Sequence, residues 1–217
     1  MTLAVAHGTP RMTAANPADH DQLADERLIE QYQQGQHETF DVLVHRYRQE
    51  LFHFLSRFLG DRAAADDVFQ DTFLQVHISA DTFDTSRRFR PWLFTIAANK
   101  ARDHLRKKAR RPAAPLSAPI GGDDSGQTYV DLLEADLPMP HDLAESGELA
   151  DRMSRTIQTM PDHLREILLL AYFEKLSYAE IAEVLSVPLG TVKSRLHAAV
   201  GTFADRWKSQ NPDGSVA

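Results

Sequence analysis

The stretch that most constrains the fold of this chain lies near its C-terminal end, between residues 176 and 196. Ser177 and Glu180 have the spacing of a capping box, in which each side chain satisfies a free amide in the first turn of a helix. Apolar residues recur at helical spacing on both sides of a break, and Pro188 suits the start of a second helix because its fixed φ and missing amide cost nothing there. Two short helices joined by a turn of three or four residues form a helix-turn-helix.

The expected second helix turns polar and cationic side chains away from its apolar side. These residues are Thr191, Lys193, Ser194, Arg195 and His197. Short hydroxyl groups and cations of this kind bind phosphates and the base edges of the DNA major groove. The pattern therefore favours a DNA-binding helix-turn-helix over an ordinary helical hairpin with solvated charges. It does not indicate which kind of DNA-binding protein this is.

Charge divides the rest of the chain into blocks. The 217 residues carry a net charge of −7. Residues 87–111 nevertheless hold ten Lys or Arg and one acid, whereas residues 112–151 hold nine acids and no Lys or Arg. Residues 112–142 are also rich in Pro and Gly, which resist helix and strand, so this segment is predicted to be a flexible acidic linker.

Apolar spacing predicts helices on both sides of this linker and no strand. We expect a short helix that stops near Gly35, a long one closed by Gly60, a third from about 62 to 76, a loop from 78 to 89 around Phe83, and a fourth that begins at Pro91. A further helix contains the spaced residues 164–172. The predicted fold class is all-α, with two small helical domains. The predicted division is a flexible tail at 1–21, a domain at 22–111, the linker at 112–142, the helix-turn-helix domain at 143–209 and a tail at 210–217.

Composition excludes several classes of protein. The chain has no cysteine, which rules out disulfides and cysteine-bound zinc, and its ten histidines are scattered without a metal-binding motif. No run of about eighteen apolar residues indicates a membrane span, and no apolar segment near the start indicates a secretory signal. We therefore expect a cytoplasmic protein without a metal or other cofactor.

Two segments carry a family resemblance. Residues 66–73, followed by Phe83 and residues 90–103, resemble the sigma-70 family of bacterial RNA polymerase initiation factors. Residues 188–195 resemble the C-terminal promoter-reading domain of the same family. The two motifs occur in the family's order, and the resemblance covers roughly residues 21–208. The absence of a middle helical domain makes the chain similar to the small, two-domain extracytoplasmic-function group.

The resemblance implies three binding surfaces and a set of partners. Binding to core RNA polymerase is implied for Asp66, Asp67, Gln70 and Asp71. Melting and capture of the −10 promoter element is implied for Phe83, Arg87, Arg88, Arg90, Trp92, Asn99, Lys100, Arg102 and Arg106. Reading of the −35 element is implied for the polar residues of the helix-turn-helix, although Ala198 stands where family members often have a basic residue. The resemblance also implies regulation by an anti-sigma factor.

Two other classes of function remain as alternatives. A stand-alone helix-turn-helix regulator would leave the acidic row near Asp66 without a role and would normally need a dimer surface. An enzyme such as a recombinase is ranked last, because no nucleophilic serine in a basic pocket and no metal-binding carboxylate cluster is evident. The sequence therefore predicts a sigma factor that is not an enzyme.

Overall fold

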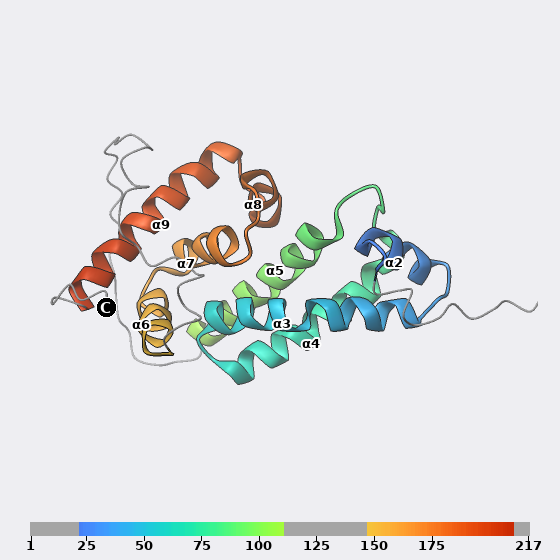
Figure 1. Cartoon of the computed structure of the whole chain (residues 1–217), viewed down its shortest axis with the longest axis horizontal. Coiled ribbons are helices and arrows are strands. Elements are labelled where there is room, and N and C mark those ends of the chain that lie inside the picture. Colours follow the sequence, from blue (N-terminus) through green and yellow to red (C-terminus); the bar gives the residue numbers. More distant parts are fainter. Residues whose placement is uncertain (1–21, 111–146, 211–217) are drawn as a thin grey trace, which may run out of the picture.

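The computed structural model of the chain describes residues 22–110 and 147–210 (Figure 1). Every regular element in these two ranges is helical, so the predicted all-α class with two helical units is confirmed. The predicted tail at 1–21, the linker at 112–142 and the last residues from 211 lie outside the described residues. Within the described parts, no helix is long and apolar enough to cross a membrane.

The N-terminal unit is a bundle built around one long helix. Its elements are α2 (Asp25–Gln33), α3 (Glu38–Leu59), α4 (Arg62–Ser79), the short 3₁₀ helix η1 (Ala80–Thr82) and α5 (Phe89–Arg110). Phe54 of α3 lies at the centre of the core, with its ring centroid 5.9 Å from that of Phe58 and 5.4 Å from that of Phe94. Burial of such large aromatic rings supplies much of the stability of a small helical unit.

The C-terminal unit contains the helix-turn-helix. Its elements are α6 (Gly147–Gln158), α7 (Asp162–Leu168), the π-helical turn η3 (Leu169–Phe173), α8 (Tyr178–Leu185) and α9 (Leu189–Gln210). Val192 and Leu196 of α9 are buried, and so are Phe203 and Trp207 two to three turns later. The apolar face of α9 therefore continues well beyond the first two turns of the helix and anchors it in its unit.

Several predicted helix ends are confirmed. Gly60 follows α3 with a left-handed backbone (φ +68°), a conformation that glycine adopts without the cost of a Cβ. Asp61 caps α4 by accepting hydrogen bonds from the amides of Ala63 and Ala64 at 3.0 and 3.3 Å. The capping box is complete, since Ser177 Oγ accepts from the Glu180 amide at 3.3 Å while Glu180 accepts from the Ser177 amide at 2.8 Å.

Four predicted boundaries are wrong. The expected loop after Val76 is partly helical, because α4 continues to Ser79 and η1 follows it. Helix α5 starts at Phe89, two residues before Pro91. The backbone amide of Phe89 has no partner within the helix, and it donates a hydrogen bond to the Glu26 carboxylate at 2.8 Å.

The other two errors concern the C-terminal unit. The helix expected through residue 172 widens into η3, whose i→i+5 bond joins the Glu174 amide to the Leu169 carbonyl at 3.1 Å. The second helix of the helix-turn-helix is not short, because the apolar spacing that holds it continues to Trp207.

The two units pack against each other, which the sequence did not predict. Helix α8 packs against α5, and η3 packs against α3 (Figure 1). Arg165 of α7 donates to the Phe58 carbonyl of α3 at 2.7 Å, and the guanidinium of Arg57 lies 4.6 Å from the ring centroid of Phe173. Both contacts join residues that are more than 100 positions apart in the sequence.

Candidate protein and nucleic-acid interfaces

Helix α4 carries a row of exposed carboxylates. Asp66, Asp67, Gln70 and Asp71 all face solvent, as predicted for a polar helix face. The Gln70 amide donates to Asp66 at 3.1 Å, one turn away. No described cation forms an ion pair with these carboxylates, so their charge is free to attract a basic partner and to repel DNA.

A groove of about 780 Å³ runs between α3 and α4 beside this row. Asp66 and Gln70 line one wall, while the other wall belongs to α3. The residues of that second wall are Val44, His45, Arg48, Gln49, Phe52 and His53. None of these residues was predicted from the sequence, although four of them follow the i, i+3, i+4, i+7 spacing of a single helix face: His45, Arg48, Gln49 and Phe52. A protein helix laid in this groove would contact polar groups on both sides and apolar groups at its floor.

Three aromatic rings cluster where η1 leads into α5. The Phe83 ring lies 4.5 Å from the Trp92 ring and 6.0 Å from the Phe89 ring, measured between centroids. Gln33 of α2 holds the turn in place by donating to the carbonyls of Ala80 and Phe83 at 2.7 and 2.9 Å. Phe83 is only 8% exposed, so its ring supports the side of Trp92 rather than projecting from the loop.

One face of α5 gathers several of the predicted DNA-binding residues. Trp92, Asn99 and Arg106 are seven residues apart, which places them on the same face at intervals of about 10 Å. Asn99 is exposed, and its side-chain oxygen accepts a hydrogen bond from Arg102 at 2.6 Å. Lys100 lies 3.4 Å from Gln75 of α4. This face offers hydrogen-bonding groups and cations beside a partly buried aromatic ring.

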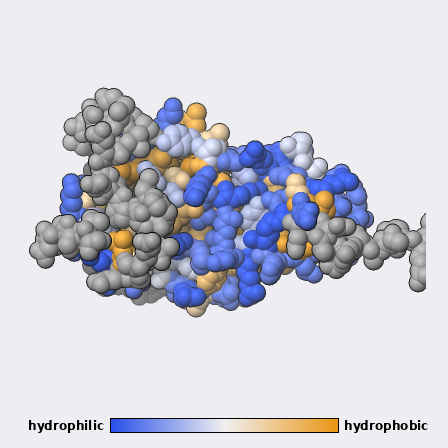
Figure 2. Space-filling view, viewed as in Figure 1, coloured by the Kyte–Doolittle hydropathy of each residue, from blue (hydrophilic) through white to orange (hydrophobic). Residues whose placement is uncertain are grey.

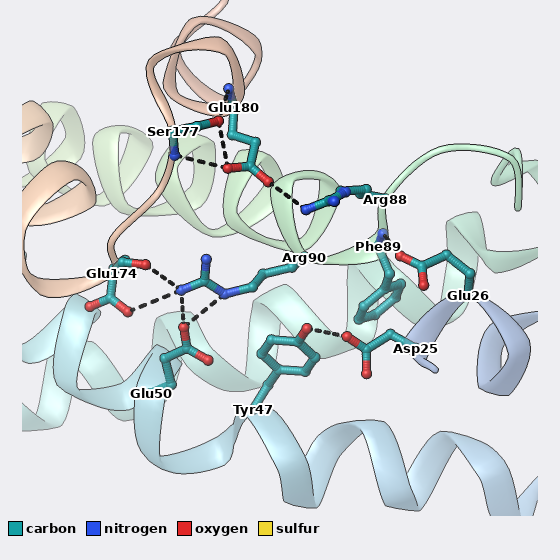
Figure 3. Close-up of polar contacts among 10 residues, drawn as sticks. All are labelled: Asp25, Glu26, Tyr47, Glu50, Arg88, Phe89, Arg90, Glu174, Ser177 and Glu180. Atoms are coloured by element: carbon teal, nitrogen blue, oxygen red, sulfur yellow. Dashed lines mark hydrogen bonds and ion pairs between the residues drawn. The ribbon is translucent and has the colours of Figure 1, made fainter. Parts of the chain in front are cut away.

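Three arginines in or just before the first turn of α5 contact the C-terminal unit, and two of them, Arg88 and Arg90, are drawn in Figure 3. Arg87 forms an ion pair with Glu183 of α8, and Arg88 lies 3.4 Å from Glu180. Arg90 lies about 200° around α5 from Trp92, away from the aromatic face. It donates to Glu50 of α3 at 2.9 Å and to the backbone carbonyl of Glu174 at 2.6 Å (Figure 3). Predicted DNA-binding cations are therefore engaged by carboxylates of the same chain.

Buried carboxylates lie along the contact between the units. Burial raises the pKa of Glu174 to about 8, with the nearby Glu50 adding to the effect and Arg90 opposing it. Burial likewise raises the pKa of Glu166 to about 7, although Arg102 and Arg195 work against it. Glu166 lies 3.6 Å from Arg102, close enough for an ion pair but too far for a hydrogen bond. Glu166 therefore interacts with Arg102, which is predicted to bind the −10 element, and with Arg195, which is predicted to bind the −35 element.

The capping carboxylate behaves differently from the buried ones. Burial alone would raise the pKa of Glu180, but the hydrogen bonds from Ser177 and the charge of Arg88 outweigh it and lower the pKa. Glu180 thus stays ionised and serves both the helix cap and the contact with Arg88.

The exposed side of α9 begins one residue after Pro188. The left-handed Ser186 (φ +53°) ends α8, and the amides of Thr191 and Val192 donate to the Pro188 carbonyl at 2.9 and 3.1 Å. Lys193 and Ser194 are exposed, whereas Thr191, Arg195 and His197 are half-buried. All five side chains lie on the broad side of the helix opposite the buried Val192 and Leu196, as predicted.

Two family models match the chain, in the order of the two units. The Sigma-70 region 2 model matches residues 43–111, and the Sigma-70 region 4 model matches residues 150–202. The first range includes the acidic row of α4 and the basic face of α5. The second contains the helix-turn-helix.

Curated relatives and solved structures agree with these matches. The ECF RNA polymerase sigma factor SigW of Bacillus subtilis is 34% identical over 171 residues, which cover 79% of this chain and 90% of that protein. The ECF RNA polymerase sigma-E factor of Escherichia coli K12 is 33% identical over 183 residues, with 82% and 92% covered. Among solved structures, CnrH in complex with the cytosolic domain of CnrY is 27% identical with a TM-score of 0.62, and covers 88% of this chain and 100% of CnrH.

Proposed function

The chain belongs to the extracytoplasmic-function group of the sigma-70 family, and from that premise we propose how its surfaces divide the work of transcription initiation. As a sigma factor, it binds core RNA polymerase and directs the enzyme to specific promoters. The observation that carries the division of labour is the opposite charge of two faces of the N-terminal unit. The exposed carboxylates lie on α4 and the cations lie on α5.

The acidic row of α4 is the polymerase-binding surface. Asp66, Asp67 and Asp71 would meet basic side chains of the core enzyme, with Gln70 as a neutral hydrogen-bonding partner. The adjoining groove extends this surface onto α3, where Arg48 and Gln49 form its second wall. DNA phosphates are repelled from this side of the unit, so polymerase and promoter would approach from different directions.

The face of α5 around Trp92 and Asn99 captures the opened −10 element. An unstacked base needs an aromatic surface and hydrogen-bonding groups, and this face provides both. Phe83 contributes by supporting the indole ring. Arg106, Lys100 and the arginines near the start of α5 would hold the phosphate backbone of the separated strand. The action is binding and strand capture, without covalent chemistry by the sigma factor itself.

The exposed side of α9 reads the −35 element. Lys193, Ser194, Arg195 and His197 would reach base edges and phosphates in the major groove, with Thr191 near a phosphate. Ala198 lies among them and offers only a methyl group. An anti-sigma factor remains the expected regulator, as the family resemblance implies, and the similar CnrH is solved in complex with another protein, the cytosolic domain of CnrY.

Charge reversal on α4 tests this assignment. Replacing Asp66, Asp67 and Asp71 by Lys should weaken binding to core polymerase by about 100-fold, at roughly 1 kcal/mol for each reversed contact. The helices should remain folded, because these side chains are exposed. Fluorescence anisotropy of the labelled chain titrated with core polymerase measures the affinity.

A matched control reverses three exposed carboxylates elsewhere, at Asp81, Asp151 and Asp205. This control has the same change in net charge and should bind core polymerase within about threefold of the original chain. Equal loss of affinity in both variants, or unchanged affinity in the α4 variant, would remove the acidic row from the polymerase interface.

A further inference from the structure

We propose that Arg102 determines which base the −10 face of α5 accepts, because it holds the Asn99 amide so that only the N–H donors of that amide are available to DNA. Arg102 is thus a positioning residue for a base-reading side chain, in addition to its contact with phosphate. The inference rests on the proposed −10 role of α5 and deepens it by naming the chemical class of base that fits.

The orientation of the Asn99 amide follows from the chemistry of its partner. Arg102 Nη2 donates a hydrogen bond to Asn99 Oδ1 at 2.6 Å. A guanidinium has five N–H donors and no acceptor, so it can face the oxygen of an amide but not its nitrogen. A charge-assisted bond of this kind is also stronger than a bond between two neutral groups. The oxygen of the exposed Asn99 is therefore occupied, and its NH₂ group is available to a partner.

Arg102 is itself held by its own helix. Its Nε donates to the Ala98 carbonyl at 3.3 Å, one turn earlier in α5. The Glu166 carboxylate lies 3.6 Å from the same Nε, which adds charge but no hydrogen bond. Two of the five guanidinium donors are thus used within α5, and three remain for the phosphate that Arg102 is proposed to bind. The phosphate contact and the bond to Asn99 can therefore exist together.

The available side of Asn99 distinguishes bases by their donors and acceptors. A complete Asn amide presents an acceptor beside a donor and matches adenine, whose N6 amino group lies beside an acceptor nitrogen. The Asn99 amide presents donors alone, so it matches an edge with two neighbouring acceptors. Guanine offers N7 and O6, and cytosine offers O2 and N3 on the Watson–Crick edge that an unstacked base exposes. Adenine would place its amino group against the Asn99 NH₂ group, with no acceptor between them.

The base preference of the full chain can be measured with core polymerase and a forked promoter fragment. The double-stranded part comes from a promoter that the chain transcribes, and the single-stranded −10 segment is randomised. Bound fragments are sequenced, and the ratio of guanine plus cytosine to adenine at each position is compared with that in the unbound library. With the original chain, guanine or cytosine should exceed adenine by about tenfold at the position that Asn99 reads, as expected for one well-placed polar contact.

Arg102→Met tests the positioning role, since methionine is unbranched and has no N–H donor. The freed Asn99 oxygen can then accept from adenine, so the ratio should fall to within about threefold of one. Overall binding should also fall at every sequence, because a phosphate contact is lost.

The matched control is Arg106→Met, which removes the same charge from α5. Arg106 forms an ion pair with Asp103 and not with Asn99, so this variant should bind all sequences less tightly but keep the ratio. Asn99→Ala should remove the preference, and adding Arg102→Met to it should change the ratio no further. Circular dichroism of each variant checks that its helices are intact.

An unchanged ratio with Arg102→Met would overturn the inference, and so would an equal loss of preference with Arg106→Met, which would assign the preference to charge. An adenine preference with the original chain would also contradict it. An unchanged ratio with Asn99→Ala would refute both the inference and the assignment of Asn99 to the −10 element. Failure of the original chain to direct core polymerase to any promoter would refute the proposed function itself, and the inference with it.

Discussion

At the scale of single residues, the least expected feature is the burial of carboxylates where the two units meet. Glu166 and Glu174 are 4% and 5% exposed, although an acid seldom lies in such a place unless it is paired. Glu174 faces Glu50 and Arg57 of α3 and Arg90 of α5, and Glu166 faces Arg102, Arg195 and Asp162. Their raised pKa values mean that these two carboxylates bind protons more tightly when the two units are packed together, here called the closed arrangement, than when the carboxylates are solvated.

The closed arrangement should therefore depend on pH. A carboxyl group whose pKa is raised in the closed arrangement stabilises that arrangement fully at a pH below the pKa of the solvated group. This contribution is lost as the pH rises through the raised pKa, which is about 7 for Glu166 and about 8 for Glu174. Energy transfer between a donor and an acceptor dye, carried on cysteines placed at the exposed Gln34 and Ser154 of the two units, should thus be higher at about pH 6 than at about pH 9. Glu174→Gln, which cannot ionise, should remove the upper part of this change. A flat profile between the two pH values would contradict the role of these carboxylates.

At the scale of helices, the sequence was most informative where a local rule determines the structure. Gly60 and Ser177 end and begin helices as expected, and α4 begins at the expected residue 62, because caps depend on neighbouring residues alone. The start of α5 was misplaced because its first amide bonds to Glu26, 63 residues earlier. The turn η3 was missed because apolar spacing does not distinguish a π-helical turn from an α-helical one.

The candidate site shows the same division between local and distant information. The exposed row near Asp66 could be found from helical spacing, and so could the face around Asn99. The engagement of Arg87 by Glu183 could not, since it joins residues 96 positions apart across two units. Burial of Phe83 also depends on distant chain, because Gln33 of α2 holds its turn.

A substitution at Gly60 tests the role of helix ends, because Gly60 ends α3 and also lies beside Gln158 of the C-terminal unit. Gly60→Ala places a Cβ at φ +68°, which costs about 1 kcal/mol, and the new Cβ meets the amide end of Gln158. We expect the free energy of unfolding in urea to fall by about 1–2 kcal/mol. Because Gln158 also bonds to Arg57 and Arg165, the collision is isolated in the Gln158→Ala background, where Gly60→Ala should cost only the backbone strain of about 1 kcal/mol. Stability of the single variant within about 0.3 kcal/mol of the original would contradict this account.

At the scale of the whole molecule, exposed carboxylates lie on α4 and cations on α5, so the surfaces proposed for a protein partner and for a nucleic acid would not compete. The net charge of −7 is unusual for a protein that binds DNA alone, yet it suits one whose DNA-binding faces work beside a polymerase. The described surface is largely hydrophilic in the view of Figure 2. The few large apolar side chains that are well exposed in the described parts are Leu74 and Ile78 of α4 and Leu189 of α9. Two of these three therefore belong to the helix assigned to polymerase binding, where a partner would cover them.

As a member of the sigma-70 family, this chain should confer promoter specificity on core polymerase. Run-off transcription from a library of bacterial promoter fragments, with start-site mapping, tests it most directly. Core polymerase with the chain should give transcripts from a defined set of start sites, and these should disappear when the chain is left out or carries the Asp66, Asp67 and Asp71 to Lys substitutions. Start sites that are the same with and without the chain would contradict the claim.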